Sequence, residues 1–128
     1  MLDTHVVLWL AFEPARISRA ATAKIGKARR EAEVLAISGI TLLEIAVAES
    51  KGRLKLSVAV KAFLESIESR FAVLAISAEA CAKTLDLPAK YSKDPADRII
   101  GATALVHGVS LITADANIRN SKTLHTIW

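Results

Sequence analysis

Cysteine is almost absent from the 128 residues, and its scarcity excludes two kinds of site. Cys81 has no second thiol with which to form an intramolecular disulfide, and one thiol cannot build a thiolate metal centre. Cys81 stands between Ala80 and Ala82 in a helical pattern, so we expect it to be a small buried side chain.

Long apolar runs are also absent. The longest one, Val6 to Phe12, is far shorter than the roughly 20 residues that a membrane-spanning helix needs. Asp3 stands where the basic region of a secretory leader would lie. We therefore expect no membrane partner and a cytoplasmic location.

Aromatic residues make up only 5% of a chain that is 52% hydrophobic, which predicts a core of Leu, Ile, Val and Ala. Such a composition excludes a disordered chain, and the length fits one domain over residues 1–128. The net charge of +4 is modest. If bound metal neutralised four of the 13 acidic residues, the excess of basic residues would double and would attract a polyanion.

Short apolar runs alternate with helical periods, the pattern of an α/β fold. Residues 1–3, 34–38, 72–76, 110–113 and 123–127 are predicted to be strands. Residues 6–12, 18–33, 40–51, 57–70, 77–85, 94–106 and 115–119 are predicted to be helical. Together they predict a short, mainly parallel five-stranded sheet with helices on both faces, in which ligands bind at the carboxyl ends of the strands.

Four acidic residues lie where such a sheet would bring them together. Asp3 and Asp115 follow predicted strands, Glu44 lies one turn into a helix after a strand, and Asp97 opens the apolar helix 94–106. Carboxylates are the ligands that Mg²⁺ or Mn²⁺ prefers, and these ions activate water for phosphodiester hydrolysis. Crowded carboxylates without a cation would repel one another and take up protons.

Each acid also has a structural alternative, in which it caps a helix. Asp3 and Asp115 could be N-caps, Glu44 fits a capping box that starts at Thr41, and Asp97 could lie at the third position of a helix capped by Asp94. Two features favour a site instead. Glu44 falls on an apolar stripe, where a carboxylate is costly to bury, and Asp97 shares a face with small residues such as Gly101.

Four segments resemble the PIN-domain ribonucleases, and within them the VapC-type toxins of prokaryotic toxin–antitoxin pairs. These segments are Leu2-Asp3-Thr4-His5-Val6-Val7-Leu8-Trp9-Leu10, Ile40-Thr41-Leu42-Leu43-Glu44-Ile45-Ala46, Asp94-Pro95-Ala96-Asp97-Arg98-Ile99-Ile100-Gly101-Ala102-Thr103-Ala104 and Leu111-Ile112-Thr113-Ala114-Asp115. They match in order and spacing over essentially the whole chain. The resemblance implies a three-layer α/β/α sandwich and endonucleolytic RNA cleavage.

The resemblance also implies roles for particular residues. Asp3, Glu44, Asp97 and Asp115 resemble the catalytic acids that bind Mg²⁺ or Mn²⁺ in this family, with Asp115 often acting through water. Thr4 and Thr113 would orient these carboxylates. The family pattern further implies RNA as substrate, a cognate antitoxin protein as partner, and a homodimer.

Other polar and aromatic residues have two interpretations each. His5 adjoins the acids, but we expect its helix to turn it away from them, and we expect Trp9 and Trp128 to serve the core or an interface. Arg98 would contact RNA phosphate or pair with Asp94. The basic residues Arg16, Arg19, Lys24, Lys27, Arg29 and Arg30 form either an RNA track or a solvated helix face.

Competing classes fit less well. A receiver domain needs an acid after the third strand and a lysine after the last, and a dehalogenase-type phosphatase needs an acid where His5 stands. A PIN-like scaffold without catalysis would not need all four acids. A housekeeping RNA-processing nuclease stays open as the alternative to a toxin.

Overall fold

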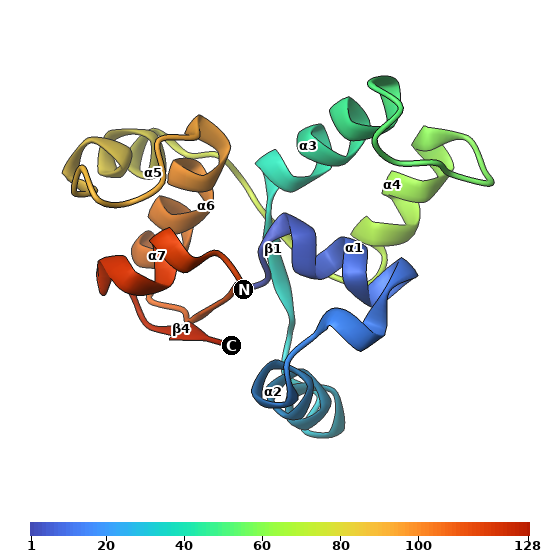
Figure 1. The fold of residues 1–128 in the computed structure, drawn as a ribbon, viewed down its shortest axis with the longest axis horizontal. Helices are drawn as coiled ribbons and strands as arrows, with labels where there is room; N and C mark the ends of the chain where they lie inside the picture. The colour runs from blue at the N-terminus through green and yellow to red at the C-terminus, as the bar shows by residue number, and fades with distance from the viewer.

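A computed structural model describes residues 1–128 and contains the elements that the sequence predicts, most of them shortened at their ends (Figure 1). The helices are α1 (Thr4–Phe12), α2 (Arg19–Arg30), α3 (Gly39–Ser50), α4 (Val60–Glu68), α5 (Ala78–Lys83), α6 (Pro95–Val106) and α7 (Ala116–Ser121). Two 3-10 turns, η1 (Pro14–Arg16) and η2 (Thr84–Asp86), follow α1 and α5. The strands are β1 (Ala36–Ser38), β2 (Ala72–Leu74), β3 (Leu111–Ile112) and β4 (Thr126–Ile127).

Local signals set several of the helix ends. The side chains of Ser18, Ser77, Asp94 and Asp115 each accept a hydrogen bond from a backbone N–H in the first turn of α2, α5, α6 and α7. Such caps satisfy donors that a helix start leaves unpaired. Gly108, just beyond α6, has a φ of +62° that a residue with a Cβ rarely adopts, so the chain can turn directly into β3.

The strands form two parallel pairs joined by a single residue. β1 pairs with β2, β3 pairs with β4, and Leu2 forms parallel bridges to Ile37 on one side and Ile112 on the other. The first predicted strand is therefore reduced to one bridging residue, and the predicted five-stranded sheet is not confirmed in that form. The parallel direction is confirmed, because all the bridges are parallel.

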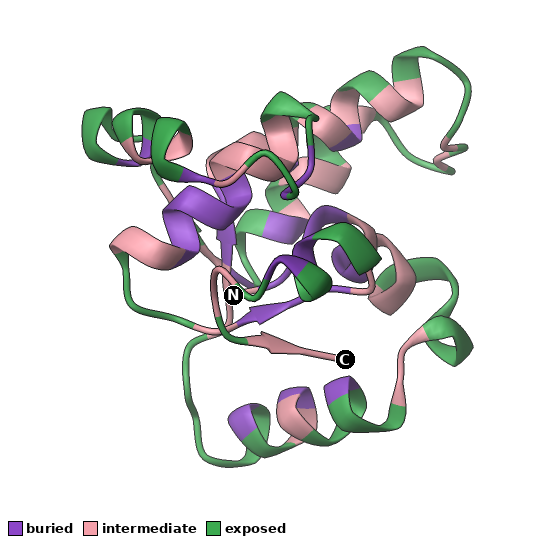
Figure 2. Ribbon diagram, turned by 60° about the vertical axis from the view of Figure 1, so that its left-hand side comes forward, coloured by how far each residue is buried: buried purple, intermediate pink, exposed green.

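Two apolar cores lie on opposite sides of these strands. The larger core joins residues of α1, α2, α3 and α4 to Ile37 and Ile112, and the smaller one joins α6 and α7 to Leu111. Leu111 and Ile112 are neighbours in one strand, so their side chains point to opposite faces. This arrangement is the helix–sheet–helix layering that the sequence predicts, and α6 is deeply buried within it (Figure 2).

Cys81 is exposed on α5, so the expectation that it fills the core is wrong. Its neighbour Ala80 is the buried residue of that helix. The two positions lie about 100° apart on a helix, so only one of them can face the core. No helix of the chain combines the length and the apolar character that a membrane crossing requires.

Gly101 lets a buried tyrosine lie against α6. Tyr91 is 2% exposed, and a Cβ built at position 101 would collide with its hydroxyl. The hydroxyl also lies 3.5 Å from the carbonyl oxygen of Asp97, one turn earlier. Gly101 therefore makes room for Tyr91, which belongs to the loop before α6, and not for the sheet.

We expect the substitution Gly101→Ala to lower the free energy of unfolding by about 1–3 kcal/mol, the usual cost of overpacking, in urea or thermal denaturation. Gly26→Ala is the matched control. Its Cβ would meet only the flexible end of Arg30 at 3.4 Å, so it should stabilise α2 by up to about 1 kcal/mol. Equal effects of the two substitutions would contradict the packing that we describe.

Candidate functional site

Asp3 lies at the centre of the edge where the strands end. Its backbone N–H donates to the carbonyl of Ile112, and the residue as a whole is 2% exposed. Thr113 donates its hydroxyl to Asp3 Oδ2 over 2.6 Å. The carboxylate does not cap α1, although Asp3 occupies the N-cap position. The capping alternative for Asp3 is therefore wrong, and the side chain points into the edge of the sheet.

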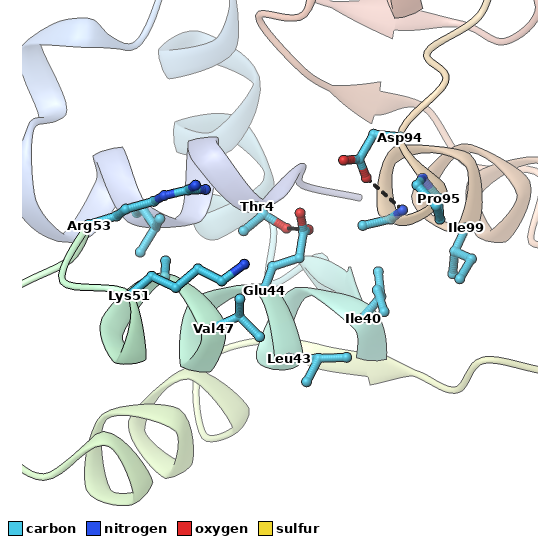
Figure 3. Close-up of a pocket in the computed structure, with 13 residues that line it drawn as sticks. Thr4, Ile40, Leu43, Glu44, Val47, Lys51, Arg53, Asp94, Pro95 and Ile99 are labelled. Atoms are coloured by element: carbon cyan, nitrogen blue, oxygen red, sulfur yellow. Dashed lines mark hydrogen bonds between the residues drawn. The ribbon is translucent and has the colours of Figure 1, made fainter.

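Glu44 reaches the same edge from α3. The Thr4 hydroxyl donates to Glu44 Oε2 over 2.5 Å. The oxygen of that Thr4 hydroxyl also lies 3.0 Å from the buried hydroxyl of Thr41. Helix α3 begins at Gly39, so Glu44 lies too far along it to form the capping box suggested by its spacing from Thr41. Figure 3 shows Glu44 and Thr4 pointing toward one another across the hollow between α1 and α3.

Asp97 comes to the site from the first turn of α6. Ser92 donates its hydroxyl to Asp97 Oδ2 over 2.5 Å, while the neighbouring Asp94 caps the helix by accepting from Ala96 N. Asp94 is therefore the cap that the sequence predicted, and the Asp97 carboxylate does not take part in capping α6. Ser92 is a residue that sequence reasoning missed, because its position five residues before Asp97 matches no helix periodicity.

Asp115 has a structural role as well as a place near the site. One of its oxygens accepts from Ile118 N over 2.8 Å, which caps α7, and its own N–H donates to Thr113 Oγ1 over 3.0 Å. Thr113 therefore links Asp115 to Asp3 through a single hydroxyl. For Asp115 the capping alternative is confirmed.

Burial and mutual repulsion raise the pKa values of three of these acids. Burial raises the pKa of Asp3, of Asp97 and of Glu44, the last to about 7, although Thr113, Ser92 and Thr4 donate hydrogen bonds that oppose the shift. The charge of Asp115 further raises the pKa of Asp3 and Asp97, and Asp3 and Asp97 further raise that of Glu44. Each carboxylate thus destabilises the charge on its neighbours.

The carboxylates are close enough to shift one another's pKa values, but they do not form a complete metal coordination shell. No three Asp, Glu, His or Cys side chains of the chain lie close enough together to hold one metal ion directly. The threonine and serine hydroxyls occupy the space beside three of the acids. Any cation in this site would therefore complete its coordination with water.

His5 faces the site, so the expectation that α1 turns it away is wrong. Its Nε2 accepts from Ala114 N over 2.9 Å, and its Nδ1 lies 3.4 Å from Asp3 Oδ2. An imidazole that accepts at Nε2 carries its proton at Nδ1, on the side of Asp3. The residue thus ties the start of α1 to the loop that carries Asp115.

Comparison with known proteins agrees with this geometry. A model of the PIN-domain family matches residues 1–122. The chain belongs to the PIN-domain family. It is 33% identical to Ribonuclease VapC22 of Mycobacterium tuberculosis over 130 aligned positions, which cover 100% of this chain and 97% of the relative. The resemblance to the VapC branch that the four segments indicated is confirmed by this relative.

Solved structures show the same fold. VapBC2 from Rickettsia felis, solved with a DNA fragment from its promoter, gives a TM-score of 0.75 at 18% identity and covers 98% of this chain and 95% of the other. A toxin–antitoxin complex from Klebsiella pneumoniae gives a TM-score of 0.60 at 27% identity, with 89% and 84% covered. The PIN-like α/β fold predicted from the sequence is therefore confirmed.

The sequence suggested that Arg98 of this PIN domain contacts RNA phosphate or pairs with Asp94, but its side chain bonds to the protein backbone instead. Its guanidinium donates to the backbone carbonyls of Ser92, Thr84 and Leu87 over 2.7 to 3.1 Å, and it forms no ion pair with Asp94. These bonds fix the loop before α6, including Ser92. The guanidinium is therefore engaged within the protein, and the predicted RNA contact of Arg98 gains no support from its contacts.

Trp9 and Trp128 pack with one another, with ring centroids 5.6 Å apart, and His5 lies 4.7 Å from Trp9. The guanidinium of Arg16 lies 4.2 Å from the centre of the Trp9 ring. With these neighbours the two indoles form part of the packing behind His5. Trp128 packs against the larger core, as one of the two expectations had it, whereas Trp9 is half-buried and lines a surface hollow.

Removing the His5 imidazole should leave Ala114 N without an acceptor. We expect His5→Ala to lower the free energy of unfolding by about 1 kcal/mol, measured by thermal denaturation, since the unpaired Ala114 N–H is partly buried and the cost of an unpaired donor rises with burial. His5→Gln places an amide oxygen near the position of Nε2 and should restore most of the loss. If glutamine were no better than alanine, the hydrogen bond to Ala114 would not be the cause.

Glu44 should make the metal-free protein less stable as the pH rises. Its pKa is about 7 in the folded protein against an ordinary value of 4.5, so between these values the folded protein holds a proton that the unfolded chain has released. The stabilisation is complete below about pH 4.5 and is lost as the pH rises through about 7. The raised pKa values of Asp3 and Asp97 act with the same sign.

Thermal melts in chelator between pH 5 and 7.5 would measure this effect. Glu44→Gln should flatten the dependence on pH, because glutamine keeps an acceptor for Thr4 and does not titrate. Glu68→Gln, at an exposed position on α4, should leave the dependence unchanged. A melting temperature that rises with pH in this window would contradict the direction of the shifts.

Proposed function

We propose that this PIN domain is a divalent-metal-dependent endoribonuclease and the toxin of a type II toxin–antitoxin pair. The observation that supports it most is the convergence of Asp3, Glu44, Asp97 and Asp115 from four separate segments on one edge of the sheet, where three of them have raised pKa values. A stable fold that concentrates negative charge in this way needs a cation to relieve it. The relative named a ribonuclease supports RNA as the substrate.

The donor set fits Mg²⁺ or Mn²⁺. All of the converging side chains offer oxygen, the ligand that hard cations prefer, and the single cysteine lies exposed on α5. Mg²⁺ commonly keeps several waters and binds through one or two carboxylates, which suits a site where no three acids share a coordination shell. Asp3 and Asp97 are the best candidates for direct ligands, because neither carboxylate caps a helix.

Glu44 and Asp115 would contribute in other ways. Glu44 is held by Thr4 and lines the hollow beside α1, where it can hold a water near a bound phosphate. Asp115 is partly committed to the cap of α7, so we assign it a water-mediated contact. When bound, the metal ion would supply an activated water and relieve charge on the phosphate.

Hydroxyl groups in the site would then keep the carboxylates in place. Thr113 donates to Asp3, Thr4 to Glu44 and Ser92 to Asp97, so three of the four acids have one oxygen directed by a hydroxyl outside their own helix or turn. Such partners orient ligands before the cation binds and keep them there during the reaction. These contacts support the roles that the resemblance implied for Thr4 and Thr113, and we assign Ser92 the same role.

A cognate antitoxin is the partner that we propose. The Klebsiella pneumoniae neighbour is a toxin–antitoxin complex, and the Mycobacterium tuberculosis relative is a VapC protein. Leu43 and Val47 on α3 are exposed apolar side chains beside the site, a surface suited to a protein partner. The homodimer stays a prediction, and neither a housekeeping nuclease nor a binding domain without catalysis is favoured by these comparisons.

The substitution Asp97→Asn tests the assignment. Purified protein should cleave RNA in Mg²⁺ and lose cleavage in chelator, and the variant should be at least about 100-fold slower, because loss of a metal ligand removes several kcal/mol of transition-state stabilisation. The same variant should relieve the growth arrest that expression of the toxin causes. Coexpression of the antitoxin should relieve the arrest caused by the parent protein.

Asp94→Asn is the matched control, because it removes the same charge from the same helix start. Asparagine is as good an N-cap as aspartate, so cleavage should stay within about threefold of the parent protein. Cleavage that survives both chelator and Asp97→Asn would refute the proposed mechanism. Equal losses in the two variants would show that charge near α6, rather than the Asp97 carboxylate, matters.

A further inference from the structure

Three basic side chains on the segment that follows α3 have no partner within the protein. Lys51, Arg53 and Lys55 are exposed, and the ion pairs and side-chain hydrogen bonds of the chain include none of them. Lys24, Lys27 and Lys61, by comparison, each pair with a glutamate on their own or a neighbouring element. This segment therefore presents three uncompensated positive charges.

These charges lie beside the carboxylates. Lys51 is the C-cap residue of α3 and follows Glu44 by seven residues, about two helical turns, so it leaves the helix on the side that carries Glu44. Lys51 and Arg53 line the same hollow of about 480 Å³ as Glu44 and Thr4. Figure 3 shows Lys51 extending along α3 toward Glu44, with Arg53 reaching over toward α1.

A second hollow continues the first one. It has a volume of about 450 Å³, includes His5, Arg16 and Lys55, and shares Leu8, Ala48 and Arg53 with the first. The two together make a groove that begins at the start of α6, passes Glu44, and continues over Arg53 to Lys55. We call the part from Glu44 to Lys55 the cationic groove.

The cationic groove suits a strand whose charges repeat at each nucleotide. The carboxylates would repel a phosphate unless a cation were bound, and they carry no group that could hold the neighbouring phosphates. Lysine and arginine side chains two turns away along the same groove can hold them without entering the site. Their contacts would position the strand and set its register relative to Asp3 and Asp97.

Five of the six basic residues that the sequence offered as an RNA track belong to α2 and lie elsewhere. The sixth, Arg16, lines the second hollow, where it pairs with Glu13. Helix α2 packs at the opposite ends of the strands, near Met1 and Val109, while the acids gather where β1 leads into α3 (Figure 1). Lys24 and Lys27 also pair with Glu33 and Glu31. The α2 residues are therefore poorly placed to hold a strand whose scissile phosphate is at the acids.

We propose that Lys51, Arg53 and Lys55 bind the backbone phosphates of the RNA strand on one side of the scissile bond, along the cationic groove. This inference rests on the proposed function for the identity of the polyanion. It adds a binding surface that starts at Glu44 and leads away from the other acids, and it assigns this surface to residues that the sequence patterns did not single out.

Binding of a single-stranded RNA oligonucleotide to the Asp97→Asn protein tests this surface without cleavage. Fluorescence anisotropy between 50 and 300 mM salt should show that Lys51→Gln, Arg53→Gln and Lys55→Gln together weaken binding about tenfold at physiological salt. The slope of log K against log salt should fall by about 2, since each phosphate contact on a single strand contributes about 0.7. In the active protein the same changes should raise KM far more than they lower kcat.

The matched control replaces Arg19, Arg29 and Arg30 on α2 with glutamine, which changes the net charge by the same amount. It should leave the salt slope unchanged, and thermal melts should show both triple variants folded. Equal weakening by the two sets, an unchanged slope in the groove variant, or no RNA affinity in the parent protein would each overturn the proposal. The proposal would also be overturned if the groove variant kept its RNA affinity and lost only its affinity for the antitoxin.

The outcome separates this inference from the proposed function. If the groove variant loses RNA affinity but the parent protein shows no metal-dependent cleavage, the binding surface stands and the catalytic assignment fails. If cleavage depends on metal and on Asp97 while the groove variant binds RNA normally, the enzyme stands and the cationic groove fails.

Discussion

Leu2 holds the two halves of this structure together, and the position of Asp3 depends on it. The Leu2 N–H donates to the carbonyl of Ala36, and the Ile112 N–H donates to the carbonyl of Met1, so the start of the chain lies between β1 and β3. Leu2 is completely buried in the larger core. The next residue therefore leaves the sheet at its centre, and Asp3 stands between the helix that carries Glu44 and the loop that carries Asp115.

Electrostatic repulsion explains why the acids need so many hydroxyl partners. Without a cation, each carboxylate raises the pKa of its neighbours, and a charge there costs stability. The hydroxyls of Thr113, Thr4 and Ser92 oppose this cost and fix the directions of the acids. A functional site that destabilises its own fold, and is supported by its surroundings, is a common compromise in proteins.

The polar surroundings extend beyond the carboxylates in two directions. Arg98 fixes the loop that carries Ser92 by donating hydrogen bonds to three backbone carbonyls. Tyr91, in the same loop, packs against α6 in the space that Gly101 leaves. On the opposite side, the segment after α3 brings Lys51 and Arg53 into the groove that Glu44 lines. The first group holds Ser92 beside Asp97, and we assign the second to the substrate.

The sequence by itself was sufficient for the order of the helices and of the strands after the first, for the cap Asp94, and for the family. These depend on periodicity and on residues a few positions apart, which local rules describe well. It also identified Asp3, Glu44, Asp97 and Asp115 as a candidate site, although their roles as metal ligands stay a prediction. Local rules could not decide between a cap and a ligand, because both use a carboxylate at a helix start.

Tertiary structure alone decided which partner each side chain found. Glu44 is held by a threonine 40 residues away, Asp3 by one 110 residues away, and Arg98 by three carbonyls rather than by Asp94. His5 faces the acids because β3 ends beside the start of α1, a contact that no helical spacing encodes. Long-range contacts depend on how whole elements pack, so the residues that hold the site emerged only from the fold.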